Sequence, residues 1–189
     1  MIDLTAACAE TAGLLTALTD SHLDRPTPCR DMNIAALVAH VGELACAFVA
    51  AAGKDLGELT DTPPGPADLH ADWRESYPER LAQLAVAWRD PAAWTGSTRA
   101  GGVDLPAEVC GLVAATEVAV HGWDLARAAG LRYDPPTAVV EAILPHVTSF
   151  AQEPVEGLFE TPVPVPADSS VLTRVIALTG RDPQWRAAG

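Results

Sequence analysis

The sequence predicts an all-α protein, an up-down four-helix bundle with a short C-terminal extension that contains an extended segment and a helix. Three observations predict this fold class. Apolar residues recur at the three- and four-residue spacing of amphipathic helices, the alternating pattern of strands is nearly absent, and Gly- and Pro-rich stretches separate the helical segments. With 189 residues, 49% of them hydrophobic, the chain can bury one core. We therefore expect a bundle domain with a fifth helix over residues 1–152 and an extension over 153–189 packed on it.

The first two helices are predicted from their apolar stripes. An amphipathic helix is expected over residues 2–20, and the prolines of the following segment place a loop over 21–32. Asn33 can cap a second helix that runs to about Ala52. The stretch from Gly53 to Pro66 is rich in proline and glycine and predicts a connection longer than most between packed helices.

The third and fourth helices complete the bundle. A helix is expected from Ala67 to Arg89, with Pro78 in a position to bend or break it. The polar stretch over 90–106 predicts a short hairpin or a plain loop with a turn at Gly101-Gly102. The fourth helix is expected over 107–129, closed by Gly130.

The remaining segments form the fifth helix and the extension. Two consecutive prolines at 135 and 136 open a helix that runs to about Gln152. Alternating prolines require residues 158–167 to be extended. A last helix is expected from about Ser170 to Thr179.

The charge and composition exclude several classes of function. A formal net charge of -13 and a pI near 4.6 repel phosphate backbones and anionic lipid surfaces, so neither nucleic acid nor a membrane is expected as a partner. No apolar run reaches the roughly 18 residues of a membrane span, and the N-terminus lacks the basic start of a signal peptide. We expect a cytoplasmic protein. The four cysteines, at positions 8, 29, 46 and 110, lack Cys-x-x-Cys spacing and are expected as free, mostly buried thiols.

The pair Glu117 and His121 carries the main functional hypothesis. Four-residue spacing places both side chains on one helix face, among small apolar neighbours that favour burial. A buried carboxylate and imidazole need a partner, and one more histidine would let them hold a divalent metal with an open position. The alternative is a surface pair, because Glu-x-x-x-His occurs by chance in many helices. Asp124, one turn further, could orient a ligand ring or pair with Arg127 or Arg99.

His40 is the third ligand that we select from the residues alone. It lies in the apolar stripe of the second helix, beside small residues that leave room for a ligand. Bundle cores build metal sites in this way from facing helices. The alternative is a histidine satisfied by a backbone carbonyl, and the sequence alone cannot join His40 to Glu117. The other three histidines, His22, His70 and His146, are expected to be structural or exposed.

Several motifs give the chain a resemblance to a known family. They are Arg25-Pro26-Thr27-Pro28-Cys29, Leu37-Val38-Ala39-His40-Val41, His121-Gly122-Trp123-Asp124-Leu125-Ala126, and Pro162-Val163-Pro164 with Gly180-Arg181-Asp182-Pro183. Together they resemble the mycothiol-dependent maleylpyruvate isomerase family, within the DinB/YfiT-like metal-binding bundles. The resemblance runs from the first helix to Trp185 and implies a metal held by His40, Glu117 and His121. Relatives commonly read Pro-Gly-Trp where this chain has Arg30-Asp31-Met32, and the extension here is shorter than the second domain of the isomerase.

The resemblance implies a metal-dependent enzyme that uses a low-molecular-weight, mycothiol-like thiol for S-transfer to, or isomerisation of, a small electrophile. A metal with an open position lowers the pKa of a bound water or thiol. Zinc is the first expectation, with nickel, iron and manganese as alternatives, and the same ligand set is the facial triad of non-haem iron oxygenases. The alternative from another class is a non-catalytic bundle that binds a small molecule or a metal. Bundles of this type often pair through a helix face, which makes a homodimer an option.

Overall fold

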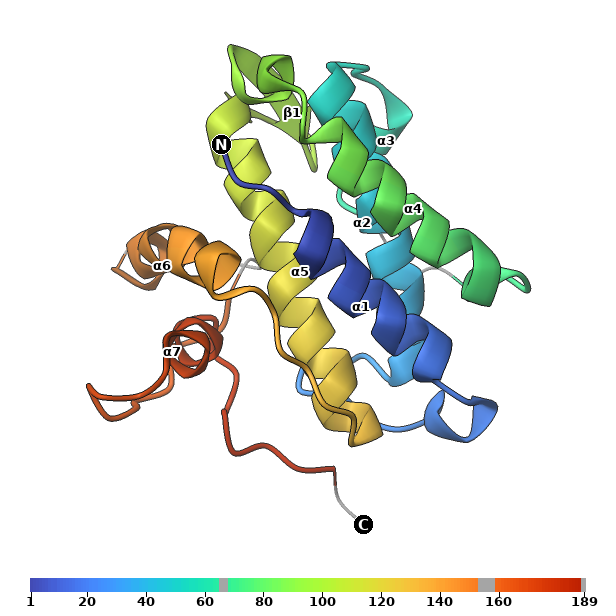
Figure 1. Ribbon diagram of the computed structural model, residues 1–189, viewed down its shortest axis with the longest axis vertical. Coiled ribbons are helices and arrows are strands. Elements are labelled where there is room, and N and C mark those ends of the chain that lie inside the picture. The colour runs from blue at the N-terminus through green and yellow to red at the C-terminus, as the bar shows by residue number, and fades with distance from the viewer. Residues whose placement is uncertain (65–67, 153–158, 188–189) are drawn as a thin grey trace.

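The computed structural model describes residues 1–64, 68–152 and 159–187, and in them most of the chain is helical (Figure 1). The four long helices of the bundle are α1 (Thr5–Ala17), α2 (Ile34–Gly53), α4 (Trp73–Ala87) and α5 (Ala107–Ala129). Beside α5 lies α6 (Thr137–Gln152), which packs in turn against α7 (Val171–Leu178). The short elements are η1 (Asp20–His22), α3 (Glu58–Asp61), η2 (Pro91–Trp94) and a two-stranded sheet of β1 (Ser97–Ala100) and β2 (Val103–Pro106). The predicted helical bundle is confirmed, and one small two-stranded sheet accompanies the helices.

Local signals in the sequence place several element ends correctly. The Asn33 side chain accepts a 2.9 Å hydrogen bond from the Ala36 N–H and caps α2 as predicted. The fourth predicted helix has the observed bounds of α5, and Gly130 ends it in the left-handed conformation with φ of 73°. The turn at Gly101-Gly102 joins β1 to β2 with φ of 57° and 79°, values that favour glycine and suit a tight hairpin.

Other elements differ from the predicted bounds. Helix α1 covers residues 5–17 where 2–20 was expected, and α4 begins at Trp73 where the prediction began at Ala67, a residue outside those described. Helix α4 continues through Pro78, because the buried side chains of Tyr77 and Leu81 hold it against the bundle on both sides of the proline. Residues 159–166 carry no helix, as the prolines require, whereas residue 158 of that predicted segment lies outside the described residues.

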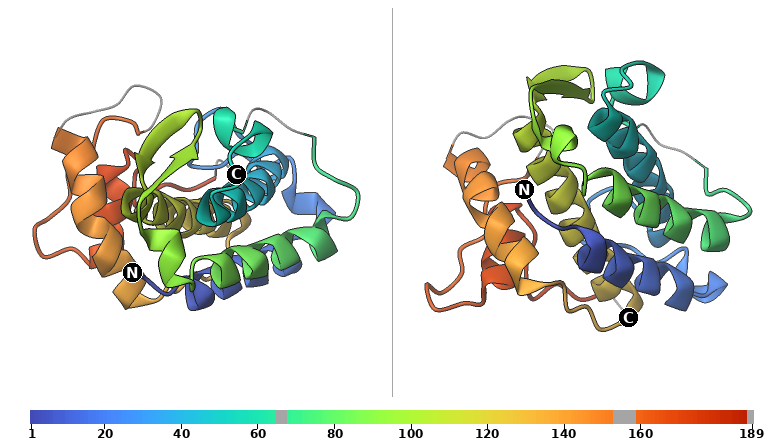
Figure 2. Two further views of the ribbon diagram at one scale, coloured as in Figure 1. Left: turned by 90° about the horizontal axis from the view of Figure 1, so that it is seen from above. Right: turned by 45° about the horizontal axis from the view of Figure 1, so that its top comes forward.

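Helices α2 and α4 run in the same direction, a departure from the antiparallel order expected for consecutive bundle helices. Gly42 lies against Tyr77, Glu43 pairs with Arg80 at 3.0 Å, and the Phe48 carbonyl accepts a 3.1 Å bond from the Trp88 indole. From one contact to the next, the residue number rises in α2 and in α4 alike, so the two helices are parallel. The connection between α2 and α4 includes α3, which lies beside the end of α2 (Figure 2).

Helix α2 is the one described helix that is long and apolar enough to span a membrane by length and composition. More than half of that window is buried inside the protein, as expected for a core helix. It contacts both α4 and α5, so its apolar residues serve the bundle core.

Gly42 is required by the close packing of α2 on α4. A Cβ at this position would lie 2.7 Å from two carbons of the buried Tyr77 ring. We predict that Gly42→Ala lowers the free energy of unfolding by about 1–3 kcal/mol, the usual range for overpacking a core. Gly13→Ala is the matched control, because a Cβ there meets nothing within 4 Å. It should stabilise α1 by about 0.5–1 kcal/mol. Urea denaturation measures the free energy of unfolding of both variants. An equal change in the two would contradict the close contact between Gly42 and Tyr77.

Candidate metal centre

His40 from α2 meets Glu117 and His121 from α5. One ligand atom from each side chain lies within 4.8 Å of the other two. The two imidazole rings have centroids 5.2 Å apart and an interplanar angle of 82°. The structure therefore brings together the three residues that were selected from the sequence.

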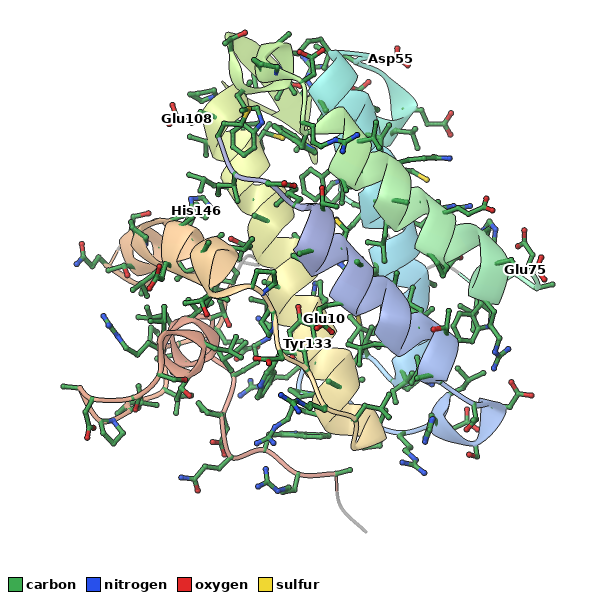
Figure 3. All side chains as sticks on the ribbon, viewed as in Figure 1. Glu10, Asp55, Glu75, Glu108, Tyr133 and His146 are labelled. Carbon is green, nitrogen blue, oxygen red and sulfur yellow. The ribbon has the colours of Figure 1, made fainter. Side chains whose placement is uncertain are left out.

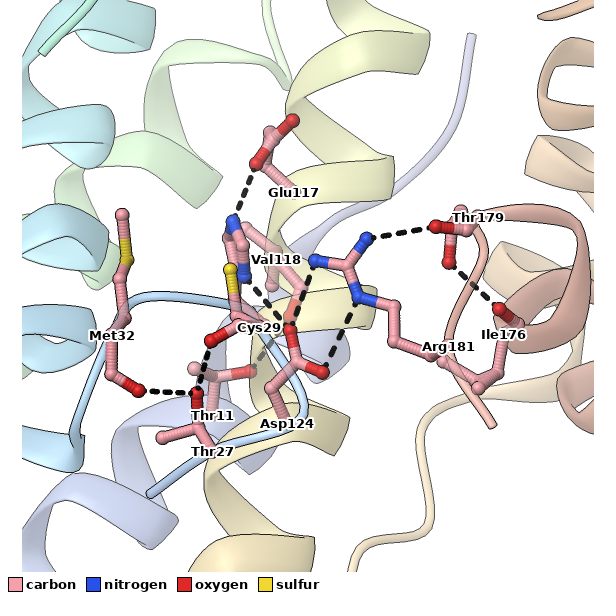
Figure 4. Close-up of polar contacts among 11 residues, drawn as sticks. Thr11, Thr27, Cys29, Met32, Glu117, Val118, Asp124, Ile176, Thr179 and Arg181 are labelled. Atoms are coloured by element: carbon pink, nitrogen blue, oxygen red, sulfur yellow. Dashed lines mark hydrogen bonds and ion pairs between the residues drawn. The ribbon is translucent and has the colours of Figure 1, made fainter. Parts of the chain in front are cut away.

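His121 is held by two carboxylates of its own helix. Its Nε2 lies 2.8 Å from Glu117 Oε2, and its Nδ1 lies 3.1 Å from Asp124 Oδ2 (Figure 4). Burial disfavours the charged ring, but the hydrogen bonds to Asp124 and Glu117 outweigh it and raise the pKa of His121 to about 9. Burial likewise works against the charged form of Glu117, and the hydrogen bond from His121 overcomes it and lowers the pKa of that carboxyl.

His40 is a neutral imidazole with an unused nitrogen. Burial, and then the neighbouring His121, lower the pKa of His40 to about 4. Its Nδ1 is buried and has no hydrogen-bond partner within the described parts of the chain. A neutral imidazole facing a carboxylate and a second imidazole is a donor set that suits a divalent cation. These residues therefore fit the metal that the resemblance implies.

Asp124 connects the centre to the C-terminal extension. Its side chain is fully buried, and Arg181 reaches it from the segment after α7, with Nη2 3.1 Å from Oδ2 and Nε 3.4 Å from Oδ1 (Figure 4). Arg181 also donates to the Thr179 carbonyl at 3.2 Å.

The sequence had offered Arg127 or Arg99 as partners of Asp124, and this interpretation was wrong. Both are engaged elsewhere, Arg99 with Asp61 and Asp104, and Arg127 with the Pro183 carbonyl.

A second group of possible ligands consists of Cys29, His121 and Asp124. It is less suited to a cation because Arg181 already neutralises Asp124. Burial raises the pKa of the Cys29 thiol to about 11 although Arg181 opposes this, so the thiol is protonated near neutral pH. Cys8 and Cys110 are fully buried, and burial raises the pKa of each to about 12, in line with the inert thiols expected. Cys29 is only half-buried and lines the site, which its sequence position did not indicate.

A cavity of about 350 Å³ opens beside the three converging side chains. Besides His40, Glu117 and His121, its walls include Cys29, Thr116, Arg181 and six apolar residues, namely Met32, Leu44, Pro63, Pro64, Val120 and Phe159. A small molecule in this cavity would contact the candidate ligands directly. The remaining histidines are not among its lining residues, and Figure 3 labels His146 on α6, which packs against α5.

Comparisons with known proteins identify the family. The model of the mycothiol maleylpyruvate isomerase N-terminal domain matches residues 4–126. The chain belongs to this family. No functionally curated protein matches the sequence. The match ends before α6, so α6, α7 and Arg181 lie beyond the family domain.

Two solved structures are similar in fold. One is a crystal structure of the mycothiol-dependent maleylpyruvate isomerase, which has a TM-score of 0.59 and 18% identity over 78% of this chain and 68% of that chain. The other is a histidine-to-alanine variant of the same isomerase, with a TM-score of 0.59 and 17% identity over 81% of this chain and 70% of that chain. At 17–18% identity, this similarity shows a shared fold and nothing more specific.

The Asp124–Arg181 pair should be strongly coupled, because removal of one partner leaves the other charge buried. We predict that Asp124→Asn and Arg181→Met each lower the free energy of unfolding by about 3–5 kcal/mol. The double variant should lose clearly less than the sum of the two. Arg186→Met, at an exposed residue of the same segment, is the control and should have little effect. Chemical denaturation of all four variants tests this, and additive losses would show that the pair contributes no coupling.

Proposed function

We propose that this chain is a metal-dependent enzyme that uses a low-molecular-weight thiol such as mycothiol for S-transfer to, or isomerisation of, a small electrophile. The observation that carries the proposal is the convergence of His40, Glu117 and His121 within 4.8 Å beside a cavity. Membership of the mycothiol maleylpyruvate isomerase family supports the choice of a thiol as cofactor.

His40, Glu117 and His121 would hold the metal. His121 would coordinate through Nε2, because Nδ1 is engaged by Asp124. A carboxylate at the second nitrogen of a ligating histidine selects the tautomer and orients the ring, and this is the role we assign to Asp124. Arg181 holds the Asp124 carboxylate in turn. A bound zinc ion would lower the pKa of a thiol at its open position and so supply a thiolate near neutral pH.

The cavity determines what the thiol can reach. Its walls are formed by α2, α5, the segment before α2, the connection before α4 and the C-terminal extension. The side chains of His121 and Glu117 are only 7% and 18% exposed to solvent. Water exclusion strengthens the interactions of charged groups and protects a thiolate from competing reactions. We assign the cavity as the site where thiol and electrophile meet.

The ligand assignment predicts the behaviour of single variants. His40→Ala, Glu117→Gln and His121→Ala should each weaken zinc binding by more than about 100-fold, because loss of an outer partner alone costs about 10- to 100-fold. Metal content after purification without chelator or nickel resin, followed by zinc titration, measures this. His70→Ala is the control because His70 lies outside the donor set. Unchanged zinc affinity in any of the three variants would remove that residue from the site.

Catalysis is tested separately from metal binding, by the rate of a thiol conjugation. The protein with one equivalent of zinc should conjugate mycothiol to an electrophilic probe at least about 100-fold faster than the uncatalysed reaction, well below the usual range for enzymes. A chelator should abolish the acceleration, and added zinc should restore it. Stoichiometric zinc without turnover, in the presence of mycothiol, would instead favour a non-catalytic metal-binding bundle.

A further inference from the structure

Six of the twelve residues that line the cavity are apolar, and together they form its apolar wall. Met32, Leu44, Pro63, Pro64, Val120 and Phe159 come from five different parts of the chain and meet at this cavity. A cavity of about 350 Å³ is within the range of small-molecule sites, whose apolar walls bind the body of a ligand while a few polar groups orient it. The apolar wall therefore indicates which kind of molecule is bound beside the thiol.

The cationic groups that line the cavity already have anionic partners. Arg181 directs Nε and Nη2 to Asp124 and Nη1 to the Thr179 carbonyl. His121 lies between Glu117 and Asp124, with Nε2 2.8 Å from Glu117 Oε2 and Nδ1 3.1 Å from Asp124 Oδ2. The three segments outside the described residues, 65–67, 153–158 and 188–189, contain no Lys, Arg or His in the sequence. They bring no further cation to the site.

A carboxylate ligand would therefore enter the cavity without a free cation to receive it. The approach is unfavourable as well, because the whole chain carries a formal net charge of -13. A divalent ion in the site would be balanced by Glu117 and by the thiolate that the proposed function supplies. An anionic group that loses its water against Met32, Leu44 and Phe159 has no compensating interaction.

We propose that the substrate of this site is a small, uncharged and largely apolar electrophile, and that dicarboxylates are excluded. This inference rests on the proposed function and specifies its substrate class. It separates the chain from an isomerase of maleylpyruvate, a compound with two carboxylate groups, although the two share a fold. Specificity comes from the apolar wall and from the prior pairing of Arg181 with Asp124.

A matched pair of chloronitroarenes tests the proposal. The neutral probe is 1-chloro-2,4-dinitrobenzene, and the anionic probe is 4-chloro-3,5-dinitrobenzoate. In both, the thiolate attacks the ring carbon that carries chlorine, a C–S bond forms, the C–Cl bond breaks and chloride leaves with the electron pair, while the thiol proton passes to buffer. No oxidant or reductant is needed. Each enzymatic rate is divided by the uncatalysed rate for the same probe, which removes the difference in intrinsic reactivity.

We expect the zinc-loaded protein to accelerate the neutral probe at least about tenfold more than the anionic one, because an uncompensated buried charge is costly. Calorimetric titration of the metal-free protein with each probe, without thiol, should show the same preference in affinity. Equal acceleration, or a preference for the benzoate, would overturn the inference and leave the proposed function intact. If neither probe turns over, the proposed function fails, and the titration decides the inference. Tighter binding of the neutral probe supports it, while equal, reversed or absent binding overturns it.

Met32 offers a charge-introduction test. Met32→Lys places a cation of similar length on the wall, and Met32→Gln is the uncharged polar control. The lysine variant should improve the relative affinity for the benzoate by about three- to fivefold, the size of a partly exposed ion pair, and the glutamine variant should leave it unchanged. The main-chain contact of Met32 with the Thr27 hydroxyl does not depend on its side chain. An equal response to lysine and glutamine would show that charge does not govern selection here.

Discussion

The site depends on the fixation of His121 between Glu117 and Asp124. Both carboxylates come from the same helix, at four and three residues from the imidazole, so the geometry follows directly from the helical repeat. The buried groups His121 and Asp124 and the half-buried Glu117 lie on one helix, which is unfavourable unless each has a partner. His121 is the partner of Glu117, Arg181 is the partner of Asp124, and His40 approaches from α2. The helix α5 is therefore the element around which the bundle and the extension are organised.

The C-terminal extension belongs to this arrangement although it lies beyond the matched family domain. Arg181 follows α7 and binds Asp124, while the Pro183 carbonyl accepts a hydrogen bond from Arg127 of α5. Gly180 has φ of 80° and lies so close to Glu160 that a side chain there would clash. These contacts attach the extension to α5, so the cavity gains Phe159 and Arg181 as part of its wall. Arg181, from a segment distant in sequence, thus holds the Asp124 carboxylate that contacts His121.

Local rules account for what could be predicted from the sequence. Asn33, Gly101-Gly102 and Gly130 each act through their own backbone or an adjacent turn, and the helices beside them were placed correctly. The spacing of Glu117 and His121 on one helix has the same local origin. Three other features depend on how distant segments pack against each other. They are the parallel direction of α2 and α4, the pairing of Asp124 with Arg181, and the position of Cys29 at the cavity. Periodicity carries no signal for such contacts. The residues alone indicated His40 as a candidate, because it lies in the apolar stripe of the second helix. To join it to Glu117 required long-range information, which the family resemblance supplied.

Zinc K-edge X-ray absorption of the protein with one equivalent of zinc tests the central claim most directly, because it distinguishes nitrogen and oxygen ligands at about 2.0–2.2 Å from sulfur at about 2.3 Å. We expect two imidazoles and one carboxylate without sulfur, and one sulfur ligand after a small thiol is added. A sulfur ligand before any thiol is added would place the ion at Cys29, His121 and Asp124 instead. A shell of water oxygens alone would show that His40, Glu117 and His121 do not hold the metal.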